Sequence, residues 1–72
     1  MNFSFCKSPD VLSTRELLVL RLISEGCSTS DISALLTLPV NTVESYRKTI
    51  RDKLGARHAA EAVHKARLLN LL

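Results

Sequence analysis

The sequence predicts an all-α protein, a compact four-helix domain that contains a helix-turn-helix. Apolar residues recur at spacings of three and four, and no strand-like alternation runs for long. Helix start and stop residues separate these periodic segments. The chain has 72 residues, enough for one small domain with a thin core. Since Phe3, Phe5 and Tyr46 are its only aromatic residues, that core must be aliphatic.

Capping signals define the first two helices. Ser13 and Glu16 have the spacing of a capping box, in which each side chain accepts a backbone N–H at the helix start. Gly26 suits the left-handed position past a helix end. Ser28 and Asp31 then repeat the capping pattern. The four helices are expected at about residues 13–25, 28–36, 40–54 and 59–70.

The start of the third helix has two alternatives. Pro39 ends the second helix because proline cannot continue a helix interior. Asn41 and Glu44 could then form a cap pair, or the helix could begin a turn earlier, around Pro39. Gly55 is expected to close the helix at its other end.

The third helix is expected to have one buried and one exposed face. Apolar residues at spacings of three and four form the buried face: Val43, Tyr46, Ile50 and Leu54. Charged and polar residues form the opposite face: Glu44, Ser45, Arg47, Lys48, Arg51 and Asp52.

The last helix also has two predicted faces, and its small residues permit close helix packing. The face toward the core is apolar: Ala62, Val63, Ala66 and Leu69. The second face is mixed: Ala60, His64, Arg67 and Leu71.

Charge is unevenly placed along the chain, whose net charge is +3. Residues 1–46 carry a net charge of −2, whereas residues 47–72 carry +5. The high positive charge of residues 47–72 indicates a polyanionic partner more than an acidic small substrate. The alternative is a solvated surface that keeps the protein in solution.

Several other function classes find no support in the sequence. Cys6 and Cys27 match no metal-binding spacing, so no metal or cofactor is expected, and Cys27 is expected to be a buried free thiol. His58 and His64 have no plausible pocket for Ser/His/Asp catalysis, so the chain is not expected to be an enzyme. No membrane-length apolar run and no signal-peptide pattern occurs, which predicts a cytoplasmic protein.

Residues 1–11 show no periodic pattern, and Ser8-Pro9-Asp10 has the composition of a turn. This segment is interpreted as an N-terminal tether or linker. The helix-turn-helix domain is expected to occupy residues 12–72.

The third helix has what a helix in the DNA major groove requires. The groove admits an α-helix, and its base edges show a distinct pattern of donors and acceptors. Glu44, Ser45 and Lys48 are best placed to contact bases, since lysine can donate to guanine and glutamate can accept from cytosine. Asn41 and Thr42 can bind phosphate at the helix N-terminus, where the helix dipole favours an anion.

Further cations near these positions are expected to contact phosphate or to be surface charge: Arg47, Arg51 and Lys53. Any exposed helix of a small protein carries such residues, so the charged face alone has little specificity. The short helix, the turn and the longer basic helix together favour DNA binding.

Six short segments form a more specific pattern. They are L-S-T-R-E at 12–16, V-L at 19–20, E-G-C-S at 25–28, D-I at 31–32, N-T-V-E-S-Y at 41–46 and K-L-G at 53–55. With these segments the chain resembles, over about residues 11–70, the LuxR-type (GerE-like) helix-turn-helix domain. That is the C-terminal effector domain of many bacterial response regulators, which belong to two-component systems, and of quorum-sensing regulators.

The resemblance implies a compact four-helix fold, DNA binding by the third helix and dimerisation through the fourth. The positions implied to contact bases are Glu44, Ser45 and Lys48. The positions implied to contact the DNA backbone are Thr42, Arg47 and Lys53. The implied dimer interface contains Ala60, His64 and Arg67.

Three positions depart from the family pattern. Pro39 stands where the family usually has a capping Ser or Thr. Ser33 replaces the usual Ala at the close contact between the second and third helices. His58 stands where a better capping residue usually opens the fourth helix. Domains of this type normally follow a receiver or ligand-sensing domain, so the chain is expected to be either an excised fragment or a stand-alone regulator.

The leading hypothesis is therefore a sequence-specific DNA-binding domain of a bacterial transcriptional regulator. It would bind double-stranded DNA as a homodimer, formed in solution or only on DNA. The alternative is a protein-interaction module, or a stand-alone anti-regulator that pairs with a full-length relative through the fourth helix. Glu44 supports this alternative, because an acid at the DNA face repels phosphate.

Overall fold

The computed structural model describes residues 12–72 and contains four α-helices in this range, with no β-strand among the described residues. The helices are α2 (Thr14–Ser24), α3 (Thr29–Leu36), α4 (Val40–Leu54) and α5 (Ala59–Leu68). The prediction of an all-α, four-helix domain is confirmed. The predicted tether 1–11, with Cys6 and the turn at Ser8-Pro9-Asp10, lies outside the described residues.

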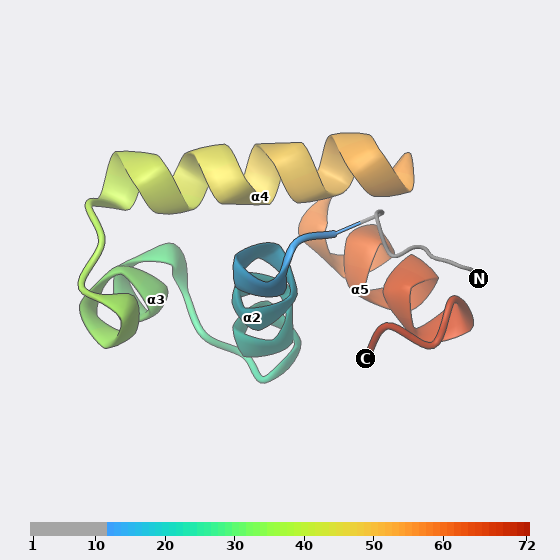
Figure 1. Ribbon diagram of the computed structural model, residues 1–72, viewed down its shortest axis with the longest axis horizontal. Helices are drawn as coiled ribbons and strands as arrows, with labels where there is room; N and C mark the ends of the chain where they lie inside the picture. Colours follow the sequence, from blue (N-terminus) through green and yellow to red (C-terminus); the bar gives the residue numbers. More distant parts are fainter. Residues whose placement is uncertain (1–11) are drawn as a thin grey trace.

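The longest helix, α4, lies across the other three (Figure 1). It packs against α2, α3 and α5, and α2 also packs against α5. In Figure 1, α3 lies below one end of α4 and α5 below the other, with α2 between them. The upper side of α4 in this view is covered by no other helix of the described chain.

The core is aliphatic, as predicted, and α4 contributes one face to it. Val43 and Ile50 are almost completely buried, Leu54 is buried, and Tyr46 is half-buried. The other helices contribute completely or almost completely buried residues: Val19, Leu20, Ile32, Ala62 and Ala66. Two alanines in α5 leave room for its backbone to approach the core closely.

The end of α5 differs from the prediction. The helix stops at Leu68, and Leu69 is 56% exposed instead of facing the core. Asn70 adopts a left-handed conformation with φ of 61°, and the backbone N–H of Leu71 donates to the carbonyl of Ala66 at 2.8 Å. The chain reverses at this left-handed turn, and Leu71 packs against the core instead of lying on the mixed face predicted for it.

Both predicted capping boxes are present. The Ser13 N–H donates to Oε1 of Glu16 at 2.8 Å, and the Glu16 N–H donates to Oγ of Ser13 at 3.1 Å. Ser28 and Asp31 form the same pair of bonds at 3.0 and 3.1 Å. Cys27, expected to be buried, is only partly buried, beside Ser28.

The turn between α3 and α4 is closed by hydrogen bonds from Ser33. Its carbonyl accepts the N–H of Leu38 at 3.0 Å, and its hydroxyl donates to the carbonyl of Leu38. Thr37 adopts the left-handed conformation in this turn, with φ of 56°. Ser33, a departure from the family pattern, thus has a structural function here.

The start of α4 resolves the two alternatives. The helix begins at Val40, with Pro39 as its N-cap residue and no side-chain cap hydrogen bond. The proposed cap pair of Asn41 and Glu44 is therefore wrong. The fixed φ of proline is compatible with an N-cap position, whereas its side chain has no acceptor to offer the first N–H groups.

The start of α5 is capped by His58, whose Nδ1 accepts the N–H of Glu61 at 3.3 Å. The Arg57 N–H donates to Oε1 of Glu61 at 2.7 Å, and this hydrogen bond holds the pKa of Glu61 below its ordinary value. Lys65 joins α5 to the end of α4, because its Nζ donates to the carbonyl of Gly55 at 2.8 Å. His58 therefore replaces the usual capping residue in function.

Candidate nucleic-acid interface

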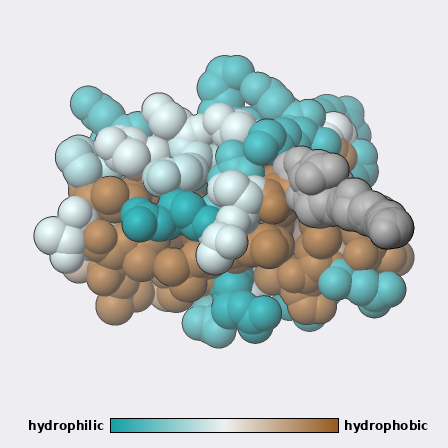
Figure 2. All heavy atoms as spheres, in the orientation of Figure 1, coloured by the Kyte–Doolittle hydropathy of each residue, from teal (hydrophilic) through white to brown (hydrophobic). Residues whose placement is uncertain are grey.

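The uncovered side of α4 forms a polar ridge, which consists of Asn41, Glu44, Ser45, Lys48 and Asp52. All five side chains are exposed. Figure 2 shows hydrophilic residues along the edge of the molecule that α4 occupies, and hydrophobic residues over α3 and α5 below it. The structure thus places the three predicted base-contacting residues side by side on one exposed helix face.

The predicted phosphate-contacting cations lie on the flanks of the polar ridge. Arg47 and Arg51 are half-buried and four residues apart, so they project from the same flank of α4. Lys53 lies on the other flank, seven residues beyond Tyr46. Half-buried long side chains pack their apolar stems on the protein and keep their charged heads in water. The ridge is therefore bordered by positive charge on both sides.

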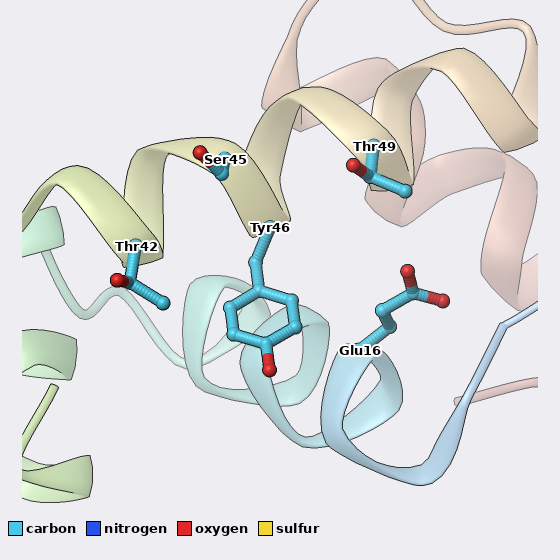
Figure 3. A pocket seen from close by; sticks show the side chains of 5 residues that line it. All are labelled: Glu16, Thr42, Ser45, Tyr46 and Thr49. Atoms are coloured by element: carbon cyan, nitrogen blue, oxygen red, sulfur yellow. The ribbon is translucent and has the colours of Figure 1, made fainter.

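A shallow recess of about 170 Å³ opens beside the ridge (Figure 3). Its lining comes from α4 and from the start of α2: Glu16, Thr42, Ser45, Tyr46 and Thr49. Small-molecule sites are commonly roughly 300–1,000 Å³ in volume and nearly enclosed. The size of this recess suits a surface depression beneath a macromolecule better than a small-ligand site.

An ion pair lies next to the recess. Nζ of Lys53 is 2.9 Å from Oε1 of Glu16, whose side chain is 8% exposed. Burial alone would raise the pKa of Glu16, but hydrogen bonds from the Ser13 backbone and from Lys53 outweigh it, and the pKa is lowered. A phosphate contact by Lys53 would have to compete with this ion pair.

A second ion pair lies on the ridge itself. Nζ of Lys48 is 2.9 Å from Oδ2 of Asp52, one helical turn further along α4. Both side chains are well exposed. Sequence reasoning placed Asp52 on this face but gave it no function, although its four-residue spacing from Lys48 was visible.

At the N-terminus of α4, Asn41 is exposed and Thr42 is half-buried. The carbonyl of Pro39 accepts the N–H groups of Thr42 and Val43 at 3.0 and 3.2 Å. No side chain caps this helix end. The N–H groups of the first two helical residues, Val40 and Asn41, therefore have no side-chain cap, which suits an anion such as phosphate.

The residues predicted for a dimer interface lie away from the ridge, on α5. Ala60, His64 and Arg67 are all exposed and share one face of this helix. Two exposed apolar side chains follow them at the helix end, Leu68 at 69% and Leu69 at 56% exposure. The structure groups this set of residues but does not bring it near the polar ridge.

Residues 12–72 contain neither a candidate metal site nor a helix that could span a membrane. No group of three or more His, Cys, Asp or Glu side chains in this range could hold a metal ion. None of the four helices is both long enough and apolar enough to cross a membrane.

Comparison with known proteins gives a family and several relatives. The family model described as bacterial regulatory proteins, luxR family, matches residues 10–66. The positive transcription regulator BvgA of Bordetella pertussis is 39% identical over 61 residues, which are 85% of this chain and 29% of BvgA. Response regulator RamR of Streptomyces coelicolor is 44% identical over 52 residues, 72% of this chain and 26% of RamR. Fimbriae Z protein of Escherichia coli is 36% identical over 62 residues, 86% of this chain and 30% of that protein.

The chain therefore spans less than a third of the length of these curated relatives. The family match includes α2, α3 and α4 and most of α5, and so contains the whole polar ridge. The resemblance inferred from six short segments is confirmed. The chain belongs to the luxR family of bacterial regulatory proteins, and it is a DNA-binding domain of a transcriptional regulator.

Proposed function

We propose that this domain binds double-stranded DNA sequence-specifically, with α4 in the major groove and the polar ridge facing the base edges. The observation that carries the proposal is the division of α4 into two faces. Val43 and Ile50 fix one face in the core, while Glu44, Ser45 and Lys48 are exposed together on the other. A rigid helix with a polar exposed face is what the groove admits.

Each ridge residue has a proposed partner. Lys48 would donate to guanine acceptors, and Glu44 would accept from the amino group of cytosine. No ion pair joins Glu44 to another residue of the range 12–72, so its carboxylate has no such neighbour to leave. Ser45 can donate or accept, which suits either base or phosphate.

Phosphate contacts would surround these base contacts. Asn41 and Thr42 would bind a phosphate at the N-terminus of α4, supported by the absence of a side-chain cap there. Arg47 and Arg51 would contact the DNA backbone from one flank of the ridge. Lys53 would contact it from the other, in competition with Glu16.

Dimerisation would use the exposed face of α5 that contains Ala60, His64 and Arg67. Two copies in a homodimer would bind half-sites about one helical turn of DNA apart, roughly 34–36 Å. The whole protein would also contain a receiver or sensor domain before this one. The description of RamR as a response regulator, with a match to only 26% of its length, supports that proposal.

A protein-interaction module is the second candidate. Two observations favour it: the exposed carboxylate of Glu44 on the ridge, and the exposed Leu68 and Leu69 at the end of α5. In this case the domain would pair with a full-length relative through α5. An apolar contact of this kind would depend little on salt, whereas DNA binding weakens steeply as salt rises.

The test is a two-dimensional NMR titration of the labelled domain with a random-sequence duplex, at about 50 and 200 mM salt. DNA binding by α4 predicts amide shifts concentrated on residues 41–53 that shrink at the higher salt. Shifts confined to residues 60–71 that grow with protein concentration would instead support the interaction module. The backbone amide signal of the exposed residue Glu25 serves as a reference. Neither DNA binding by α4 nor pairing through α5 is expected to shift it.

A further inference from the structure

We infer that Asp52 is a specificity-determining residue, which acts by holding the Lys48 ammonium away from DNA that lacks the correct base. The inference deepens the proposed function and rests on it. The sequence pattern placed Asp52 on the exposed face of the helix but assigned it no contact with DNA. If the inference is correct, removal of the Asp52 carboxylate should make the domain bind DNA more tightly but less selectively.

The geometry supports this function directly. The 2.9 Å ion pair draws the ammonium of Lys48 toward the C-terminal turn of α4. Ser45 and Glu44, the other proposed base contacts, lie three and four residues toward the N-terminus, on the opposite side of Lys48. In this state the ammonium of Lys48 is held toward Asp52, so it must move away from Asp52 to reach a base edge beside Ser45 and Glu44.

Helix stability does not explain Asp52. An acid–lysine pair stabilises a helix best when the acid precedes the lysine, and here Lys48 precedes Asp52. Asp52 also lies in the last turn of α4, where the helix dipole disfavours negative charge. Glu44 offers the favourable order at the same spacing, yet the ammonium pairs with Asp52. The ion pair is also largely exposed to solvent, where such pairs contribute little to stability.

The ion pair has different effects on the two kinds of DNA. On a non-cognate duplex, Lys48 could gain only a phosphate contact, which exchanges one anionic partner for another. On a cognate site, a guanine offers Lys48 two acceptors, N7 and O6, in fixed positions. The exchange is then favourable, so Asp52 weakens non-cognate binding more than cognate binding.

The experiment compares three forms of the domain on a random-sequence duplex. They are the wild type, Asp52→Asn, and Glu25→Gln, which makes the same charge change at an exposed position at the end of α2 remote from α4. Binding is measured by fluorescence anisotropy across a series of salt concentrations. Each form is also used to enrich sites from a randomised duplex pool.

Asp52→Asn is expected to bind the random duplex about 3–10-fold more tightly at low salt, with a salt slope steeper by about one phosphate contact. Its enrichment of particular sequences from the pool should be weaker than that of the wild type. Glu25→Gln should change neither the slope nor the enrichment. Equal effects of the two variants, or an unchanged slope for Asp52→Asn, would overturn the inference.

A double variant tests whether Asp52 acts through Lys48. In a Lys48→Ala background, Asp52→Asn should change random-duplex binding no more than Glu25→Gln does in the same background. A full effect of Asp52→Asn without Lys48 would show simple charge repulsion and overturn the inferred mechanism. Failure of the wild type to bind any duplex at low salt would overturn the proposed function itself, an outcome distinct from both.

Discussion

The ammonium of Lys53 lies 2.9 Å from the carboxylate of Glu16, and this ion pair joins the last turn of α4 to the first turn of α2. The two residues are separated by 37 positions in the sequence. Glu16 also closes the capping box with Ser13, so one buried carboxylate both caps α2 and holds α4 against it. The position of α4, the helix proposed to contact DNA, therefore depends on a residue outside the helix-turn-helix.

Replacement of Glu16 by glutamine should lower the free energy of unfolding by roughly 1–2 kcal/mol, because Lys53 loses its partner while the amide oxygen can still accept from Ser13. The matched control is Asp31→Asn, which alters the second capping box at an exposed position without an ammonium partner. Urea denaturation of both variants measures the difference. Equal losses for the two would show that the ion pair adds nothing to the cap.

The same ion pair predicts a pH dependence. The pKa of Glu16 is lower in the folded protein than its ordinary value of 4.5, so the unfolded chain binds a proton more tightly. The stabilisation by Glu16 is complete above pH 4.5 and is lost as the pH falls through the lower, folded-state pKa. Denaturation at pH values from 7 to 3 should therefore show the wild type and Glu16→Gln converging in acid. A constant difference between them would contradict the lowered pKa.

Lys48→Ala and Arg51→Ala should separate base contacts from phosphate contacts. Loss of Lys48 should cost roughly 1–3 kcal/mol on sites enriched from a random pool and relax the preferred sequence. Loss of Arg51 should weaken all duplexes alike and reduce the salt slope by about one. Binding of both variants to an enriched and a random duplex measures this difference. An equal loss on both duplexes for both variants would remove Lys48 from the base contacts.

Thr37→Gly should stabilise the domain by roughly 0.5–1 kcal/mol. Thr37 is a β-branched residue held at φ of 56°, a conformation that glycine adopts without steric cost. Part of this gain is offset by the greater freedom of glycine in the unfolded chain. Thermal denaturation measures the change, with Thr29→Gly at the start of α3 as a control that should destabilise. A loss of stability in Thr37→Gly would mean that the threonine side chain makes a compensating contact.

Ala60→Glu should prevent dimerisation on DNA without unfolding the monomer. Ala60 is exposed in the first turn of α5, where a negative charge is favourable for the helix. In a two-fold dimer, the new carboxylates would face each other across the α5 contact. Sedimentation on an enriched duplex should show one copy bound instead of two. The control is Ala34→Glu, the same change on α3 at the other end of the molecule (Figure 1); loss of the dimer there too would argue against α5.

The end of α4 and the approximate position of its start could be predicted from the sequence, because Pro39 and Gly55 lie on either side of it. Pro39 cannot be interior to a helix and Gly55 takes the left-handed C-cap, so the helix was limited to the segment between them. The end of α5 could not be predicted in this way. Leu69 and Leu71 continue an apolar pattern, and the left-handed turn at Asn70 forms because Leu71 packs on the core, which is a tertiary effect.

For the candidate site, the residues that share a helix face could be predicted from the sequence, but the ion pairs that they form could not. Periodicity was sufficient to group Glu44, Ser45 and Lys48 on one face, because helix geometry alone determines which residues share it. The pairing of Lys53 with Glu16 depends on how α2 and α4 pack, which no local pattern contains. The choice of Lys48 between acids at equal spacing on either side is likewise set by side-chain geometry rather than by sequence order.

The separation of α4 into a buried and an exposed face also bears on how such a domain can evolve. Val43 and Ile50 are buried, so the fold limits which residues can replace them. The residues of the polar ridge make no contribution to the buried core. Substitutions along the ridge can therefore accumulate without loss of folding, and under the proposed function each would alter which DNA sites are bound. Regulatory circuits can be rewired in this way through a few surface changes on an unchanged scaffold.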